Sequence, residues 1–172
     1  MNGTIAPALS ILAAPSVKPR LLVAEDDLSA RRFLCDLLTP FYEVEAAADG
    51  ELAWAIMQRS TPDLLLTDLQ MPNLDGLGLI RRARGEPRLG SLPIILLTAC
   101  QEKELLLQCL AAGADDFLLK PFSCAELLAC LQVELLTPRA KRDHGATYQT
   151  RLSALTSRPA PPPPSPAGGT EG

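Results

Sequence analysis

Short apolar runs alternate with longer segments of helical period between residues 18 and 138, and this alternation constrains the fold more than any other feature. Runs of three to six apolar residues separated by amphipathic segments are typical of repeated βα units. Such units build a parallel sheet with helices on both faces. The runs are residues 20–24, 42–47, 64–67, 93–98 and 117–119. We therefore predict an α/β fold with a doubly wound, five-stranded parallel sheet.

The composition of each run indicates its place in the sheet. The first, third and fourth runs are almost entirely apolar, as expected of strands covered on both faces. In the second run Glu43 and Glu45 alternate with Val44 and Ala46, which predicts an edge strand with one face in solvent.

Helices are expected between the strands. Asp27 is suited to cap the first helix, whose apolar positions follow the i, i+3, i+4 spacing of a buried stripe. Those positions are Ala30, Phe33, Leu34, Leu37 and Leu38. The later helices are predicted at residues 51–59, 76–84, 101–112 and 123–136, and Gly113 is expected to end the fourth helix in a left-handed conformation.

A chain of 172 residues has room for one core and two tails. We predict one domain at residues 19–137, a flexible leader at 1–18 and a disordered tail at 138–172. The tail is rich in proline and carries five basic against two acidic residues, and it has too few large apolar residues to offset the entropy of ordering. It is expected to serve solubility.

Charge and composition exclude several classes of protein. A net charge of -4 argues against direct nucleic-acid binding, and no apolar run is long enough for a membrane span. The five cysteines include no Cys-x-x-Cys pair, and His144 is the single histidine, so disulfide scaffolds, zinc sites and histidine-dependent nucleophiles are disfavoured. We expect a cytoplasmic protein.

Polar residues follow four of the predicted strands. Glu25, Asp26 and Asp27 follow the first strand, Asp68 the third, Thr98 the fourth and Lys120 the fifth. The carboxyl ends of parallel strands meet at one edge of the sheet, so these groups should converge there. Acidic groups in one crevice repel each other unless a cation enters, and their oxygens suit Mg²⁺.

The same groups predict a reaction. With the metal bound, one carboxylate oxygen could attack an incoming phosphoryl group, while Lys120 and the Thr98 hydroxyl take up charge on the phosphoryl oxygens. The product would be an aspartyl phosphate.

Four segments in order resemble the receiver domains of two-component response regulators. They are LLVAEDD at 21–27, LLLTDLQMPNLDG at 64–76, LPIILLTA at 92–99 and GADDFLLKPF at 113–122. The resemblance implies a flavodoxin-like (βα)5 receiver fold of the single-domain type, with Asp68 as phosphoacceptor and a Mg²⁺ site. The implied metal ligands are Glu25, Asp26, Asp68 and the Gln70 carbonyl. The other implied roles are Asp27 as helix cap, Thr98 as switch hydroxyl, Lys120 as phosphate-binding cation, Pro121 as a cis-proline and Phe117 as the rotating aromatic.

The resemblance also implies function and partners. A sensor histidine kinase or phosphotransfer protein would supply the phosphoryl group, and the chain would act as a signalling switch rather than an enzyme. Two departures are that Glu25 stands where aspartate is common and that Phe117 lacks a phenolic hydroxyl. Gln70 and Cys100 occupy the positions that influence phosphate lifetime in the family, but their identities assign no lifetime.

An excess of leucine predicts an output surface. Leu105, Leu106 and Leu107 span about 200° of a helix, so at least one should face outward. Receivers commonly change on the face formed by the fourth helix, fifth strand and fifth helix. We expect that face, at residues 101–112, 117–119 and 123–136, to bind a downstream protein or a second copy of the chain.

Other functions are compatible with parts of the pattern. A flavodoxin-like cofactor binder would need a phosphate-binding loop where residues 25–27 are acidic, and an aspartate-dependent phosphohydrolase would need an Asp-x-Asp motif that is absent after the first strand. A pseudo-receiver that only binds partners, and a receiver fragment of a larger regulator, remain as alternatives.

Overall fold

The computed structural model describes residues 17–136. Almost all of the predicted leader and the whole predicted tail, with His144, lie outside the described residues, so the domain limits of 19 and 137 stay predictions. Within the part of the chain that is described, no helix is both long and apolar enough to cross a bilayer.

Five parallel strands form one sheet, as the alternation of apolar runs predicts. They are β1 (Arg20–Ala24), β2 (Glu43–Ala47), β3 (Leu64–Asp68), β4 (Ile94–Thr98) and β5 (Asp116–Leu119). Their order is β2-β1-β3-β4-β5, and every neighbouring pair is parallel. Starting from β1, the chain therefore builds the sheet first to one side and then to the other. This doubly wound order confirms the predicted fold class.

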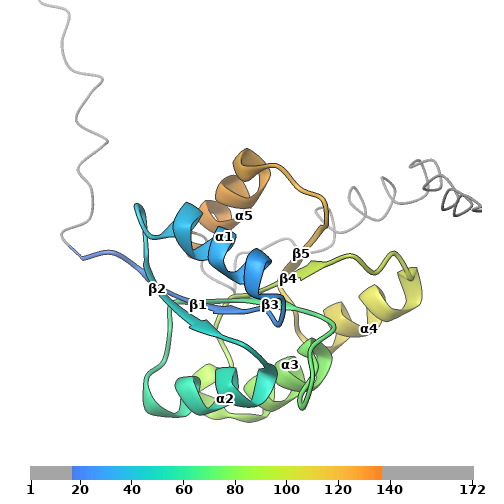
Figure 1. Cartoon of the computed structure of the whole chain (residues 1–172). Coiled ribbons are helices and arrows are strands. Elements are labelled where there is room, and N and C mark those ends of the chain that lie inside the picture. The colour runs from blue at the N-terminus through green and yellow to red at the C-terminus, as the bar shows by residue number, and fades with distance from the viewer. Residues whose placement is uncertain (1–16, 137–172) are drawn as a thin grey trace, which may run out of the picture.

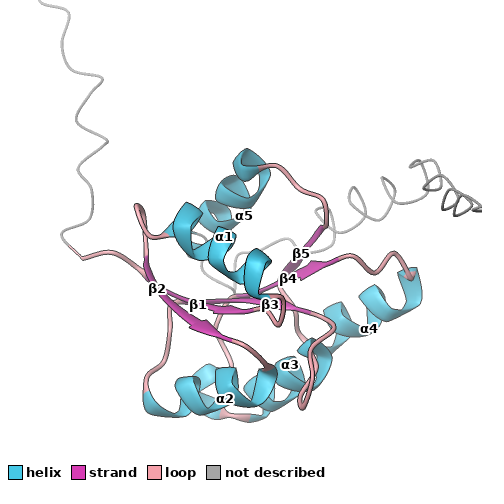
Figure 2. Cartoon of the chain, in the orientation of Figure 1, coloured by secondary structure: helices cyan, strands magenta, loops and turns pink. Residues whose placement is uncertain are grey.

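Helices cover both faces of this sheet. Figure 1 shows α1 (Leu28–Leu38) and α5 (Cys124–Leu136) on one face, and α2 (Gly50–Arg59), α3 (Gly76–Gly85) and α4 (Lys103–Ala112) on the other. A short 3-10 helix at Pro87–Leu89 leads into β4. Figure 2 shows that each strand is followed by a loop and a helix. The fourth helix begins two residues later than predicted, at Lys103, and Glu102 precedes it without a side-chain capping bond.

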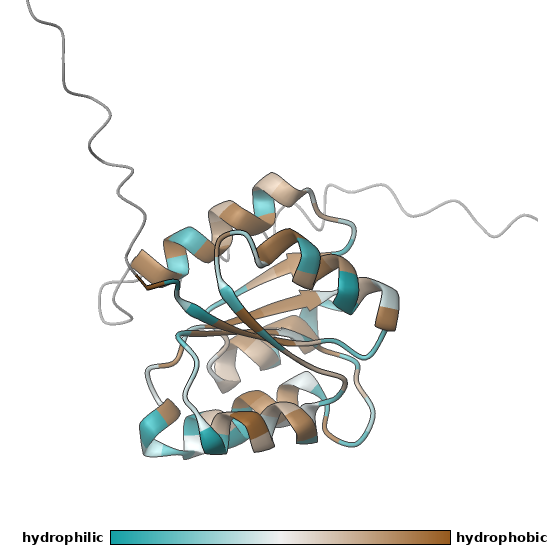
Figure 3. Ribbon diagram, turned by 60° about the vertical axis from the view of Figure 1, so that its left-hand side comes forward, coloured by the Kyte–Doolittle hydropathy of each residue, from teal (hydrophilic) through white to brown (hydrophobic). Residues whose placement is uncertain are grey.

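Two apolar clusters fill the layers between sheet and helices. Within each central strand successive residues enter opposite clusters: Leu65 joins the cluster under α2, α3 and α4, whereas Leu64 and Leu66 join the cluster under α1 and α5. All five residues of β3 and of β4 are buried, as the near-continuous apolar runs predict. Figure 3 shows this contrast between hydrophobic central strands and helices of mixed hydropathy.

The predicted edge strand is confirmed, whereas one expectation about burial is wrong. β2 lies at the edge of the sheet, with Glu43, Glu45 and Ala46 exposed. Phe33 was expected to face the core but is 51% exposed. The first helix buries only Leu34 and Leu38, so its buried stripe is narrower than the spacing of apolar residues indicates.

The predicted start of the first helix and the predicted end of the fourth helix are confirmed. The Asp27 carboxylate accepts a hydrogen bond from the Ala30 backbone N–H at 2.7 Å, which caps α1. Gly113 ends α4 with φ 113°, a left-handed conformation that a side chain would disfavour.

Candidate functional site

The carboxyl ends of four strands bring together the residues that the sequence analysis singled out. Glu25 follows β1, Asp68 ends β3, Thr98 ends β4 and Lys120 follows β5. The Lys120 ammonium lies 2.7 Å from Glu25 Oε2 and 2.7 Å from Asp68 Oδ2. A cation from the last strand therefore bridges two carboxylates from the centre of the sheet.

Three carboxylates at this edge form a possible cation site. Glu25, Asp26 and Asp68 each offer one oxygen, and these oxygens lie within 4.8 Å of one another. Glu25 is buried, Asp68 is 9% exposed and Asp26 is exposed. Hard divalent cations such as Mg²⁺ prefer such oxygen ligands and retain water on their open side. The donor set and its exposed flank therefore fit Mg²⁺.

Burial and charge act on the two innermost groups. Burial raises the pKa of Glu25 above its ordinary value, and the negative charge of Asp68 adds to this, although Lys120 opposes both. Burial alone would lower the pKa of Lys120, but its hydrogen bonds to Asp68 and Glu25 outweigh that effect and raise it. Lys120 is therefore charged at neutral pH and supplies the positive charge that the acidic cluster requires.

The switch candidates lie on the strands beside the acidic cluster. Thr98 is buried at the end of β4, and its hydroxyl oxygen accepts a hydrogen bond from the Cys100 backbone N–H at 3.0 Å. Phe117 is 1% exposed and packs in the cluster under α2, α3 and α4, so its ring is in the inward position. The peptide bond between Lys120 and Pro121 is cis, as the resemblance implied.

The loop after β3 approaches the sheet closely. A Cβ atom at Gly76 would lie 2.3 Å from the Asp68 carbonyl oxygen, so only glycine fits there. The Gly76 backbone N–H donates to the Leu69 carbonyl at 2.9 Å, and the Gln70 N–H donates to Asp68 Oδ1 at 3.3 Å. These contacts place the loop, and with it Gln70, beside Asp68.

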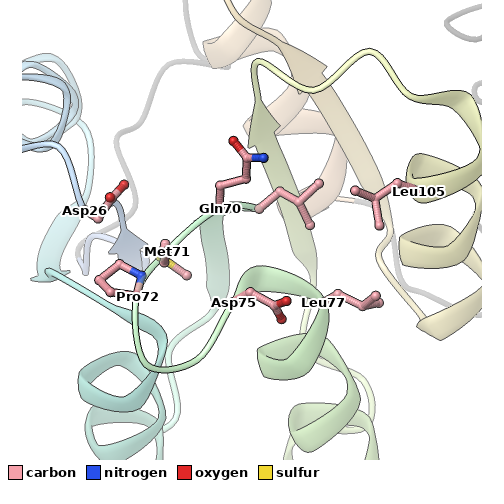
Figure 4. Close-up of a pocket in the computed structure, with 8 residues that line it drawn as sticks. Asp26, Gln70, Met71, Pro72, Asp75, Leu77 and Leu105 are labelled. Carbon is pink, nitrogen blue, oxygen red and sulfur yellow. The ribbon is translucent and has the colours of Figure 1, made fainter.

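A groove continues outward from the acidic cluster. It has a volume of about 600 Å³ and is lined by Asp26, Leu69, Gln70, Met71, Pro72, Asp75, Leu77 and Leu105. Figure 4 shows Asp26 and Gln70 at this groove, from the loops after β1 and β3. The groove therefore reaches the possible cation site at Asp26, its exposed carboxylate.

Sequence reasoning missed two contributors to this site. Arg31 on α1 donates hydrogen bonds to the backbone carbonyls of Glu25 and Asp26. Asn73, at φ 65°, donates from its side-chain amide to Asp49 Oδ2 at 2.9 Å and so holds the loop after β3 to the start of α2. No motif points to either contact, because each depends on how a loop folds back on its neighbour.

The first comparison with known proteins concerns families. The model of the response regulator receiver domain matches residues 21–132.

Curated relatives contain this segment within longer chains. The similar proteins include the sensor histidine kinase TmoS of Ectopseudomonas mendocina, 40% identical over 66% of this chain and 12% of that protein. The phosphate regulon transcriptional regulatory protein PhoB of Rhizobium meliloti is 39% identical over 72% of this chain and 54% of its own length. The response regulator MprA of Mycobacterium tuberculosis is 40% identical over 81% of this chain and 60% of its own length. The chain thus spans between 12% and 60% of these three relatives.

Solved structures agree with the family match. The chemotaxis protein CheY4 of Vibrio cholerae has a TM-score of 0.66 at 32% identity, over 69% of this chain and all of that one. The receiver domain of the sensor histidine kinase PA1611 from Pseudomonas aeruginosa also has a TM-score of 0.66, at 33% identity over 70% of this chain and all of its own. That structure contains a magnesium ion coordinated in its active-site cleft.

Proposed function

Because this chain belongs to the family of response regulator receiver domains, we propose that it is a signalling switch that accepts a phosphoryl group on Asp68. The observation that carries the proposal is the contact of Lys120 with both Asp68 and Glu25, at the edge where three carboxylates converge. Among these carboxylates Asp68 ends the central strand β3 and is nearly buried but still open to solvent. It is therefore the acceptor we assign.

The proposed reaction is transfer from a phosphohistidine. An Asp68 carboxylate oxygen attacks phosphorus, the P–N bond breaks, and its electron pair stays on the imidazole nitrogen, which takes up a proton. Lys120 and the Thr98 hydroxyl donate hydrogen bonds to the phosphoryl oxygens, where negative charge collects. Glu25, Asp26, Asp68 and the Gln70 carbonyl would hold Mg²⁺, which when bound neutralises charge on the phosphoryl group.

Phosphorylation can bias the fold only through contacts that exist once the group is present. Moving a two-state equilibrium from 1:99 to 99:1 takes about 5.5 kcal/mol. Two or three charge-assisted hydrogen bonds from Lys120 and Thr98, at roughly 1.5 to 3 kcal/mol each, can supply this. We propose that Thr98 and Phe117 then change position together, and that Phe117 does so through packing alone because it has no hydroxyl.

The output surface is the face of α4, β5 and α5. Leu106 is buried whereas Leu107 is 43% exposed, which confirms that at least one of the three consecutive leucines faces outward. On α5, Val133 is 58% and Leu136 is 82% exposed. We propose that these side chains bind a downstream protein or a second copy of the chain after phosphorylation, with no direct nucleic-acid or membrane contact.

The donor we propose is a sensor histidine kinase or a phosphotransfer protein, and the chain acts in its own phosphotransfer and dephosphorylation without a separate enzymatic activity. We place the exchange in the cytoplasm, where the five free cysteines would stay reduced. The matched relatives are longer than this chain, so binding of a downstream partner by the whole protein is likewise a proposal.

The test of the acceptor is intact mass after incubation with Mg²⁺ and acetyl phosphate. Wild type should gain one phosphoryl group, Asp68→Ala should gain none, and Asp36→Ala, a change at an exposed aspartate of α1, should behave as wild type. A phosphoryl group on Asp68→Ala would show that the acceptor is another residue. Asp26→Ala should retain the fold and bind Mg²⁺ more weakly, because it loses a charged ligand.

A further inference from the structure

We propose that Arg31 is a positioning residue that aims the Asp26 carboxylate at the cation site, an inference that rests on the proposed function. Arg31 lies in the first turns of α1 and is half-buried. Its Nη1 donates to the Glu25 carbonyl oxygen at 2.5 Å and to the Asp26 carbonyl oxygen at 3.1 Å. Residues 25–27, between β1 and α1, form a turn that we call the acidic turn. One guanidinium nitrogen therefore bonds two successive carbonyls of this turn.

The direction of the Asp26 side chain depends on its backbone. Lys120 fixes the Glu25 carboxylate directly, but within residues 17–136 no hydrogen bond or ion pair reaches the exposed Asp26 carboxylate. Yet an Asp26 oxygen lies within 4.8 Å of the oxygens of Glu25 and Asp68. A short aspartate side chain keeps such a place only if the peptide groups on either side of it are fixed.

Other contacts fix the two ends of the acidic turn and leave its centre to Arg31. The Glu25 backbone N–H donates to the Ala47 carbonyl at 3.1 Å, which anchors the start of the turn to β2. The Asp27 carboxylate caps α1 through Ala30, which anchors its end. Arg31 is the side chain that holds the carbonyls between these anchors, because its Nη1 carries two hydrogens and donates to both acceptors.

The positive charge of Arg31 has the opposite effect on metal binding. The guanidinium of Arg31 lies beside the acidic turn and repels Mg²⁺. If this repulsion were the larger effect, removing Arg31 would strengthen Mg²⁺ binding. If the role of Arg31 is to hold the turn, removing Arg31 weakens Mg²⁺ binding, because the Asp26 carboxylate is no longer held in the direction of the metal. The sign of the change therefore distinguishes the two effects.

Arg31→Met tests the proposal because methionine keeps an apolar stem and removes the donors. We expect Mg²⁺ affinity, measured by titration calorimetry, to fall about tenfold, at the lower end of the range for groups that orient metal ligands. Amide exchange at residues 26–28 without Mg²⁺ should become faster. Arg32→Met, at the exposed neighbouring arginine, should leave both measurements at their wild-type values.

Two further measurements separate the possible failures. At saturating Mg²⁺, labelling of Arg31→Met by acetyl phosphate should return close to the wild-type rate, because Asp68 and Lys120 are intact. If wild type itself is not labelled, the proposed function fails, whereas a labelled wild type with unchanged or tighter Mg²⁺ binding in Arg31→Met overturns only the role of Arg31.

A conservative variant covers the case in which Arg31→Met does not fold. The lysine side chain of Arg31→Lys keeps the charge and the donors but is shorter, so its nitrogen should reach the two carbonyls less well. Its Mg²⁺ affinity should therefore lie between those of wild type and Arg31→Met. If Arg31→Met does not fold and Arg31→Lys does, wild-type Mg²⁺ affinity in Arg31→Lys would overturn the proposal.

Discussion

Replacing Lys120 by methionine should destabilise the metal-free protein and make it depend on Mg²⁺. The ammonium of Lys120 lies 2.7 Å from both Glu25 and Asp68, and its side chain is 25% exposed. Methionine keeps most of the stem and removes the charge, so two nearly buried carboxylates would face each other without a counter-charge.

The size of the effect follows from these contacts. Hydrogen bonds to charged groups contribute about 1.5 to 3 kcal/mol each, so two of them give about 3 to 6 kcal/mol before solvent exposure is considered. Removing one partner of a buried ion pair costs about 3 to 5 kcal/mol. Because water reaches part of Lys120, we expect a loss of about 3 kcal/mol, which for a domain of this size lowers the melting temperature by about 10 °C.

The assay is thermal unfolding in EDTA and in Mg²⁺ at neutral pH. Mg²⁺ should raise the melting temperature of Lys120→Met more than that of wild type, because the divalent ion then supplies all of the positive charge at the site. The matched control is Lys103→Met, at an exposed lysine at the start of α4, which should melt as wild type does.

Acid provides a second check. The pKa of Glu25 is raised, so acid protonates it and removes one of the two mutually repelling negative charges. The difference in melting temperature between Lys120→Met and wild type should therefore shrink as the pH falls below neutral. A Lys120→Met protein that melts within 2 °C of wild type in EDTA at neutral pH would refute the reasoning.

Three further predictions follow from packing and burial. Gly76→Ala should lose about 1 to 3 kcal/mol and be phosphorylated more slowly, because its Cβ would push against the Asp68 carbonyl, whereas Gly85→Ala, with nothing within 4 Å of its Cβ, should lose no stability in denaturant unfolding. Leu66→Ala should lose about 2 to 5 kcal/mol, also measured in denaturant, because Leu66 is fully buried in β3. Burial raises the pKa of Cys109 from 9.0 to about 11, so the folded state holds this proton. The unfolding free energy should therefore fall more steeply between about pH 9 and 11 in wild type than in Cys109→Ala.

The sheet could be predicted because its strands carry their own signals. Nearly all-apolar runs such as residues 64–67 indicate strands buried on both faces, and the polar residues after four of the five runs mark the edge at which the site assembles. The exposure of Phe33 could not be predicted, because apolar spacing along α1 does not show how wide a stripe the sheet and α5 can cover.

The charged groups of the site could be predicted from the sequence, whereas the residues that hold its loops in place could not. Glu25, Asp68 and Lys120 are charged groups at strand ends, and the parallel sheet alone brings them together. Arg31 and Asn73 act through backbone carbonyls and a loop contact, so their roles depend on the exact path of the chain and leave no spacing that a sequence pattern would reveal.

The separation of Glu25 and Lys120 by 95 positions has a consequence for protein synthesis. A ribosome adding about 5 to 20 residues per second releases Glu25 roughly 5 to 20 s before Lys120. During that interval the emerging chain already carries Glu25, Asp26 and Asp68 but not the ammonium that joins them. We therefore expect the proposed acceptance of a phosphoryl group to become possible only when β5 has been translated and has paired with β4.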